Sequence, residues 1–290
     1  MRKTLLAVLA HPDDESFGVG GTLARYAAEG VDVHIAIATD GVAGSVARGY
    51  EHTLADLVTI RTQELEAAVN ILGGRLHLLG FQDSGYIGDP ANKLPEAFIN
   101  IDKEISIGRL VSLIRTIKPQ VILTHDESGG YFHPDHIHCC TITTEAFTAA
   151  GDEEKYPHFG PPFQSQRLFY SAFPNHMVKI FAFLLRLRGK NPKKIGRNED
   201  IDLTKLGIPS QRLHAKIDYR NFWDVKRRAS AEHRSQGGGT SNSRSLPEWF
   251  QRRFLAHEYF IRAIPSAADG YRINDLFEGV KIESFEIDET

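Results

Sequence analysis

The stretch LLAVLAHPDDE, residues 5–15, is an apolar run that ends directly on a histidine, a proline and three acids. A short apolar run bounded by turn residues predicts a fully buried strand. Pro12 disfavours a helical conformation at His11, so we expect the chain to turn there before a helix begins. The stretch therefore predicts a buried strand whose carboxyl end carries a cluster of polar side chains.

Strand and helix patterns alternate through the first half of the chain. Further strands are predicted at 31–39, 76–79, 121–124 and 168–171, and helices at 16–29, 57–72, 106–117 and 134–149. This alternation predicts a mostly parallel sheet with right-handed crossovers and helices on both faces. We therefore expect an α/β, Rossmann-like fold. Its site should lie at the carboxyl ends of the strands, where His11, Asp40, Asp83 and His125 fall.

The length of 290 residues fits one large domain. We expect residues 1–172 to form an α/β catalytic core. Residues 173–290 are less regular and show neither an internal repeat nor a separate core pattern. We expect them to form an irregular C-terminal cap that completes the same domain.

Charge and cysteine content exclude several classes of protein. A net charge of -3 provides no basic field for nucleic acid. The two cysteines, Cys139 and Cys140, are adjacent and offer neither a disulfide framework nor a Cys-x-x-Cys metal site, which suits a reducing cytoplasm. No run approaches the ~18 apolar residues of a membrane-spanning helix. We expect a cytoplasmic protein without a transmembrane segment.

The first motif, HPDDE at residues 11–15, has the composition of a metal site. His11 and Asp14 are three residues apart across a strand-to-helix turn, so both can face one point. Imidazole and carboxylate are ligands that a catalytic zinc ion accepts. Asp13 remains beside the ion as a carboxylate that could take a proton from water. The alternative is that the acids only cap a helix.

The second motif, HPDH at residues 133–136, follows Gly129-Gly130 and opens a helix. His133 and His136 project toward the same side, so one can bind metal while the other reaches the substrate. Asp135 could hold a histidine in the correct tautomer. Two such motifs at strand ends favour a metal site over a pair of surface histidines.

Together the motifs supply three metal ligands, His11, Asp14 and His136. Three protein ligands leave a fourth position for water, which is the open form typical of a catalytic ion. Zinc is the expected ion, with another divalent ion such as Fe²⁺ as the alternative. The motifs therefore predict a metal-dependent hydrolase.

These motifs also carry a resemblance to a known family. From about Leu5 to about Gln236 the chain resembles the LmbE-like zinc-dependent N-deacetylases, which are related to the GlcNAc-phosphatidylinositol (PIG-L) de-N-acetylases. The stretch GGYFHPDHIH, residues 129–138, is similar to the branch that makes or uses mycothiol. That branch includes a GlcNAc-inositol deacetylase and the mycothiol S-conjugate amidase.

The resemblance implies roles for the remaining residues of the motifs. It implies the same three metal ligands, with Asp13 as the general base. His133 would stabilise the oxyanion in its charged form and protonate the leaving amine, and Tyr131 would polarise the substrate carbonyl. The residues themselves leave open whether Asp13 or His133 protonates the amine.

Three further residues match substrate-binding positions of that family. Arg61 corresponds to its sugar-binding arginine and Asp83 to the acid that holds a sugar hydroxyl. His233, in the stretch HRSQ, corresponds to a histidine near the site. Phe132 stands where the mycothiol branch often has a smaller residue.

The leading hypothesis is an enzyme that removes an acyl group, most readily acetyl, from a small N-acylated glucosamine conjugate. The alternatives are an amidase of a larger acylated amino-sugar, such as a mycothiol S-conjugate, and a non-catalytic protein that binds metal or sugar. A nucleotide-binding protein is disfavoured, because the glycines at 18, 20 and 21 fall within a predicted helix rather than before it. A homo-oligomer remains open.

Residues 177–197 combine an apolar run with a series of cations. Such a segment could lie on an anionic membrane surface. It could also be an amphipathic helix that packs onto the core or onto a partner subunit. We favour packing, and on that basis expect no binding to anionic vesicles.

Overall fold

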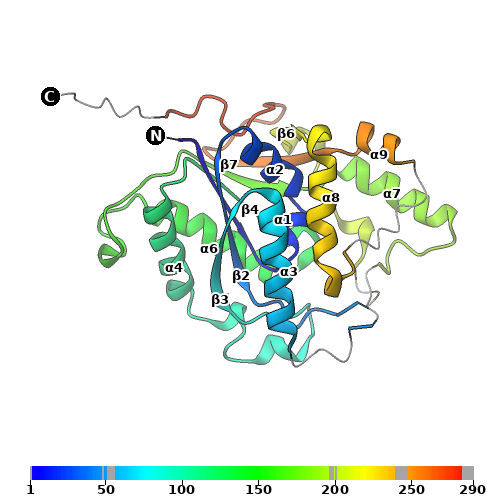
Figure 1. Cartoon of the computed structure of the whole chain (residues 1–290), viewed down its shortest axis with the longest axis horizontal. Coiled ribbons are helices and arrows are strands. Elements are labelled where there is room, and N and C mark those ends of the chain that lie inside the picture. Colours follow the sequence, from blue (N-terminus) through cyan, green and yellow to red (C-terminus); the bar gives the residue numbers. More distant parts are fainter. Residues whose placement is uncertain are drawn as a thin grey trace.

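The computed structural model describes residues 2–47, 49–50, 56–195, 199, 201–238 and 247–282. A seven-stranded sheet runs through its centre in the order β3-β2-β1-β4-β5-β7-β6 (Figure 1). The strands are β1 (Thr4–Leu9), β2 (Asp32–Thr39), β3 (Arg75–Phe81), β4 (Val121–Thr124), β5 (Arg167–Ala172), β6 (Ala215–Asp218) and β7 (His257–Ile264). The first five pair in parallel, which confirms the mostly parallel α/β sheet expected from the sequence.

Helices cover both faces of this sheet (Figure 1). They are α1 (Asp14–Phe17), α2 (Gly20–Ala28), α3 (Leu57–Leu72), α4 (Lys103–Ile117), α5 (Gly129–Phe132), α6 (Pro134–Ala149), α7 (Asn175–Leu187), α8 (Trp223–Glu232) and α9 (Glu248–Phe254). On one face, Leu5 of β1 belongs to an apolar cluster with Leu23 of α2 and Leu65 of α3. On the other face, Leu6 belongs to a cluster with Ile142 of α6. Both faces of β1 are buried, as its continuous apolar sequence predicts.

The predicted helix at 16–29 is two helices, because the chain breaks between α1 and α2. At Gly18 an added Cβ would lie 2.7 Å from the backbone oxygen of Asp14. The short first helix keeps residues 13–15 close to the end of β1, where the polar cluster was expected.

The C-terminal residues contribute more regular structure than the irregular cap we expected. Strands β6 and β7 pair antiparallel and extend the sheet beyond β5. Helix α8 packs against α2 and α3, and its Ala229 is buried in the same cluster as Leu65. The second half therefore builds part of the same core.

The packing of helix α7 differs from the packing that we expect for residues 177–197 from the sequence. It lies at the right-hand end of the molecule in Figure 1. Ala182 and Leu185 are its buried residues, whereas Ile180, Phe183 and Leu187 are exposed. Of the two arrangements expected for this segment, packing on the core or on a partner subunit, packing of its main apolar side onto the core is therefore wrong. Arg197 lies outside the described residues.

Within the described ranges, no helix combines the length and apolar character needed to cross a bilayer.

Candidate active site

Three side chains from the two motifs meet at the carboxyl end of β1. His11 Nδ1 lies 3.1 Å from His136 Nε2 and 3.6 Å from Asp14 Oδ2, and His136 Nε2 lies 3.4 Å from Asp14 Oδ2. In a tetrahedral zinc site with bonds of about 2.0–2.1 Å, neighbouring ligand atoms are about 3.3 Å apart. The three atoms therefore have the spacing of three corners of a tetrahedron, so this donor set fits a divalent ion.

The other ring nitrogen of His11 faces carboxylates. His11 Nε2 lies 3.1 Å from Asp135 Oδ2 and 3.4 Å from Asp83 Oδ1. Burial disfavours a charged His11, but Asp83 and Asp135 outweigh it and raise its pKa. A carboxylate on the far nitrogen keeps a hydrogen on Nε2, so the proton that a bound ion would displace is the one on Nδ1. This position suits the orienting role predicted for Asp135.

His125, at the end of β4, lies against two of these residues, His136 and Asp14. Its ring stacks on His136 with centroids 3.9 Å apart, and its Nε2 lies 3.4 Å from Asp14 Oδ2. The same Nε2 accepts a hydrogen bond from the Ala10 amide at 3.0 Å. The Nε2 lone pair that accepts this hydrogen bond is not available to an ion. The strand-end position of His125 was the only signal for it in the sequence.

Asp14 is held in its ionised form by these histidines. Burial opposes ionisation, but His136 and His125 outweigh it and hold the pKa of Asp14 well below its usual range. The backbone amide of His11 also favours the ionised form, since it donates a hydrogen bond to Asp14 Oδ2 at 2.8 Å. An ionised carboxylate is the form that binds a metal ion.

Asp13 sits beside the three ligand atoms in an unusual backbone conformation. Its φ of 130° is rare for a residue other than glycine. Its amide donates to Glu15 Oε2 at 3.0 Å, and its Oδ2 lies 3.3 Å from Arg61 Nη2. Burial raises the pKa of Asp13 to about 7, with Arg61 opposing the rise and Asp14 adding to it. A carboxyl group with a pKa near neutrality can both accept and return a proton.

Arg61 is buried and fixed by the loops around it. Its guanidinium donates to the backbone oxygens of Gly41 and Pro12. A Cβ at Gly41, where φ is 70°, would lie 2.5 Å from Arg61 Nη1, so glycine lets this loop approach the guanidinium. Arg61 therefore positions Asp13 as well as facing the pocket.

His233 is fully buried and pairs with Glu15 instead of contacting solvent. Its Nε2 lies 2.6 Å from Glu15 Oε1, and both side chains are fully buried. The prediction that His233 contacts the substrate does not fit this burial. The following 3-10 turn (Arg234–Gln236) instead brings Gln236 to the pocket wall. From its position in the sequence, Glu15 is predicted only to cap a helix, so the buried pair with His233 was missed.

We expect His233→Ala to lower the free energy of unfolding by about 3 kcal/mol, because it leaves a buried carboxylate without its partner. Burial opposes a charged His233, but Glu15 outweighs it and raises the pKa of His233. The stabilisation is therefore complete below the unfolded pKa of histidine and is lost as pH rises through the folded pKa. Urea unfolding should show a larger loss at about pH 6 than at about pH 9.

The double variant Glu15→Gln/His233→Ala is the control for this pair. It should lose less stability than the sum of the single variants, because residues in direct contact are coupled. Equal losses at both pH values, or strict additivity, would contradict the ion pair.

His133 and Tyr131 face the same point from α5 and the start of α6. His133 Nδ1 accepts from the Asp135 amide at 3.2 Å, so the neutral ring carries its hydrogen on Nε2. Burial, aided by the nearby charge of His11, lowers the pKa of His133 to about 3. The structure thus favours a neutral donor over the charged His133 that we expected.

Tyr131 lies with its ring 5.1 Å from that of His136 and 5.7 Å from that of His133. Burial raises the pKa of Tyr131 above its usual range, so the hydroxyl stays protonated and can donate. A Cβ at Gly129 would lie 3.0 Å from His136 Cβ, which explains why glycine precedes this loop. The loop can therefore approach the ligand cluster closely.

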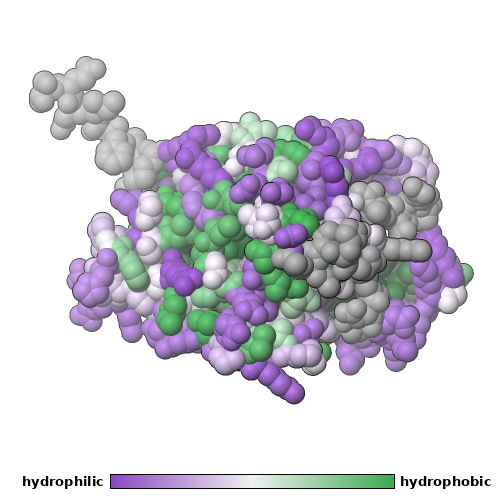
Figure 2. All heavy atoms as spheres, turned by 60° about the horizontal axis from the view of Figure 1, so that its bottom comes forward, coloured by the Kyte–Doolittle hydropathy of each residue, from purple (hydrophilic) through white to green (hydrophobic). Residues whose placement is uncertain are grey.

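These groups open into a pocket of about 200 Å³. Its lining includes His11, Asp13, Arg61, Asp83, Tyr86, Asp89, Tyr131, His133, Ile201 and Gln236. The oxygens of Asp83 accept from the Gly85 and Ala43 amides at 2.8 and 3.1 Å, so this carboxylate also holds two loops. Figure 2 turns the lower end of Figure 1 toward the viewer, and hydrophilic and hydrophobic side chains are interspersed there.

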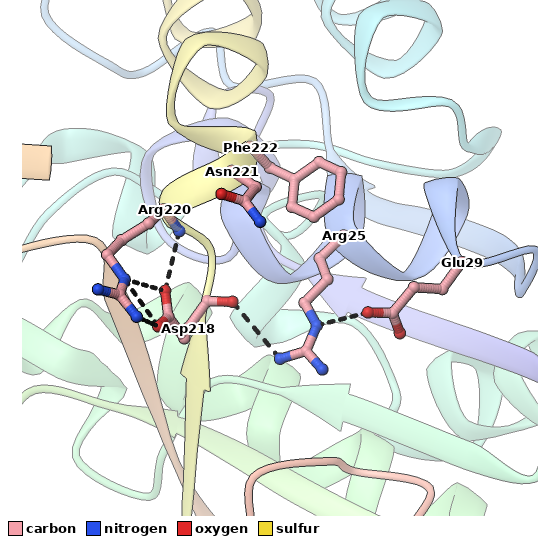
Figure 3. Close-up of a pocket in the computed structure, with 6 residues that line it drawn as sticks. All are labelled: Arg25, Glu29, Asp218, Arg220, Asn221 and Phe222. Carbon is pink, nitrogen blue, oxygen red and sulfur yellow. Dashed lines mark hydrogen bonds and ion pairs between the residues drawn. The ribbon is translucent and has the colours of Figure 1, made fainter.

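A larger hollow of about 430 Å³ lies away from the motifs, between Arg25, Glu29 and the turn at 218–222 (Figure 3). Its charges satisfy one another. Arg25 Nε lies 2.8 Å from Glu29 Oε1, and Arg220 Nη2 lies 2.5 Å from Asp218 Oδ2. Size alone therefore does not single out the candidate active site, and the smaller pocket is the one lined by residues of both motifs.

The sequence matches known proteins along almost its whole length. Residues 6–147 match the family described as PIG-L, GlcNAc-PI de-N-acetylase. A 1D-myo-inositol 2-acetamido-2-deoxy-alpha-D-glucopyranoside deacetylase of Rhodococcus jostii is 36% identical, with 96% of this chain and 98% of that protein covered. A mycothiol S-conjugate amidase of Streptomyces coelicolor is 43% identical, with 96% and 97% covered.

Solved structures share the fold at lower identity. The N,N'-diacetylchitobiose deacetylase of Pyrococcus horikoshii has a TM-score of 0.59 at 17% identity, covering 90% of this chain and 83% of that one. GalB, the 4-carboxy-2-hydroxymuconate hydratase of Pseudomonas putida KT2440, has the same TM-score at 20% identity, covering 92% and 99%. One fold thus serves different reactions. The nearly full-length identities, together with the two motifs, show that this chain belongs to the PIG-L family of GlcNAc-PI de-N-acetylases.

Proposed function

We propose that this protein is a divalent-metal-dependent amide hydrolase that removes an acyl group, most readily acetyl, from an N-acylated glucosamine conjugate. The observation that carries this proposal is the tetrahedral spacing of His11, Asp14 and His136 with Asp13 beside them. The names of the two relatives support the reaction class, since one is a deacetylase and the other an amidase.

Zinc is the ion that we propose at these three residues, with Fe²⁺ as the alternative. Two imidazoles and one carboxylate form a donor set that both ions accept. When bound, such an ion polarises a carbonyl oxygen and lowers the pKa of a water molecule to about 7.

Asp13 moves the protons in the proposed reaction. Its carboxylate takes a proton from the attacking water as the water oxygen bonds to the amide carbon. The carbon–nitrogen bond then breaks, and Asp13 returns the proton to the leaving nitrogen, giving an amine and a carboxylic acid. Because the surroundings keep His133 neutral, Asp13 is the better of the two proton donors. Arg61 holds the Asp13 carboxylate in place at 3.3 Å.

Two neutral donors would stabilise the tetrahedral intermediate. His133 and Tyr131 both line the pocket, and the Nε2 hydrogen of the first and the hydroxyl of the second would be the donors. Fixed donors of this kind lower the energy of a developing oxyanion. We propose that Arg61, Asp83 and Gln236 contact the sugar, since all three line the pocket.

A substrate panel tests the proposed function. We expect metal-loaded enzyme to release free amine from N-acetylglucosaminyl-inositol faster than from N-acetylglucosaminyl-malate or N,N'-diacetylchitobiose, measured with an amine-reactive fluorophore. Preference for a bulky S-conjugate over every N-acetyl substrate would favour the amidase alternative, which the Streptomyces coelicolor relative supports. Metal binding without hydrolysis of any substrate would instead indicate a binding protein.

We also propose a reducing compartment, the cytoplasm, because both cysteines are free and buried.

A further inference from the structure

Helix α7 presents its apolar stripe to solvent. Ile180, Phe183, Leu184 and Leu187 follow the spacing that normally marks the buried side of a helix. Ile180 is 58% exposed, Phe183 57% and Leu187 68%. Burial against the protein is limited to the other side, as Ala182 and Leu185 show. The helix therefore carries an apolar stripe that the described part of the chain does not cover.

A group of exposed cations accompanies this stripe. The cations of α7 and the turn after it are Lys179, Arg186, Arg188, Lys190, Lys193 and Lys194. One ion pair is found for them among the described residues, between Lys194 and Glu199 at 3.9 Å. The whole chain has a net charge of -3, so this end is basic against a slightly acidic background.

We propose that α7 and the turn through Lys194 dock the protein onto the surface of an anionic lipid bilayer. The combination of an apolar stripe and flanking cations is the composition of a helix that lies in a membrane interface. Apolar side chains would enter the boundary between headgroups and acyl chains, while the cations would meet anionic headgroups. This proposal does not depend on the enzymatic activity proposed above.

A second copy of this chain fits the surface less well. Two copies meeting through α7 would bring two basic groups together, and like charges across an interface oppose association. An anionic surface would instead attract these cations. Charge complementarity thus selects a lipid surface over self-association.

The turn after α7 ends beside one residue of the pocket wall. After α7 the chain forms backbone hydrogen bonds between Ile195 and Ile201, at 3.0 and 3.1 Å. Ile201 then lines the pocket beside the ligand cluster. The turn that carries the last of these cations is therefore connected to the pocket wall through the pair Ile195 and Ile201.

Cosedimentation of the full chain with vesicles tests the proposal. We expect at least a tenfold larger bound fraction on mixed phosphatidylcholine/phosphatidylglycerol vesicles than on pure phosphatidylcholine. About 1 M salt should remove most of this difference, because screening then acts over about 3 Å. Absence of binding to anionic vesicles at low salt would overturn the proposal.

Two variant sets separate the contributions of the stripe and the cations. Ile180→Ser/Phe183→Ser/Leu187→Ser should abolish binding, and Arg186→Gln/Arg188→Gln/Lys190→Gln should reduce it to the level on neutral vesicles. The matched controls are Leu78→Ser/Ile105→Ser and Lys93→Gln/Lys155→Gln/Arg228→Gln, exposed residues elsewhere that should change binding less than twofold.

Circular dichroism and light scattering complete the design. All variants should keep the wild-type spectrum, since the altered side chains are exposed. If the stripe variant binds vesicles normally, or instead converts a dimer into a monomer, the lipid surface is not the occupant of α7.

Discussion

His136→Ala is expected to remove the bound metal and to lower kcat/KM by about 10³-fold or more. The substitution deletes one of the three proposed ligand atoms, which lie 3.1–3.6 Å from one another. A metal ion contributes several kcal/mol to stabilising charge in such a transition state, and each 1.36 kcal/mol is a factor of ten in rate. Metal analysis of the purified variant, combined with kcat/KM on the preferred substrate, measures both effects.

The control for His136→Ala is His138→Ala on the same helix. His138 packs edge-on against Phe98 with ring centroids 4.6 Å apart and takes no part in the ligand cluster. That variant should retain metal and most of the activity. Removing the metal from the wild-type protein with a chelator should also abolish activity, and added Zn²⁺ or Fe²⁺ should restore it. A His136→Ala enzyme that keeps full activity would rule out the proposed ligand set.

Asp13→Asn is expected to lower kcat by about 10²–10⁴-fold while metal content stays unchanged. The amide cannot take a proton from water or return one to the amine. The Asp13 side chain is not one of the three ligand groups, so KM and metal binding should change little. Steady-state kinetics on metal-loaded protein, with the metal content measured in the same sample, tests this separation.

Asp89→Asn provides a matched control in the same pocket. Asp89 also lines the pocket, but its Oδ1 accepts from the Ala91 amide at 2.8 Å, which marks it as a turn residue. Its variant should keep kcat within about tenfold of the wild-type value. Near-normal hydrolysis by Asp13→Asn would show that another group moves the proton.

Strong local patterns predicted the elements that carry the motifs. The apolar run before His11 became β1, and the predictions of helices at 57–72 and 134–149 are confirmed by α3 and α6. A parallel strand that is covered on both faces is a continuous apolar run, so its burial can be predicted from the sequence. In each of these helices, the helical repeat of apolar residues likewise lies within one segment of the chain.

The C-terminal strands could not be predicted in the same way. Strand β6 has four residues, with the pattern Ala-Lys-Ile-Asp, and lies at the edge of the sheet beside β7. So short a segment carries too little periodicity to stand out, and its pairing depends on a partner about 40 residues away. Helix α7 poses the opposite problem. Its amphipathic pattern is clear, but the pattern does not say whether the apolar side faces the protein or the solvent.

The sequence by itself determined the chemical types of the site and their placement at strand ends. It placed His11 and Asp14 after β1, and His136 at the start of a helix beyond β4. Only the tertiary structure decided which atoms meet. It turned His11 Nδ1 toward His136, 125 residues away, and turned Nε2 toward Asp135. It also buried His233 behind Glu15. The physical reason is that periodicity comes from neighbours along the chain, whereas side-chain direction, burial and pKa come from residues that folding brings together.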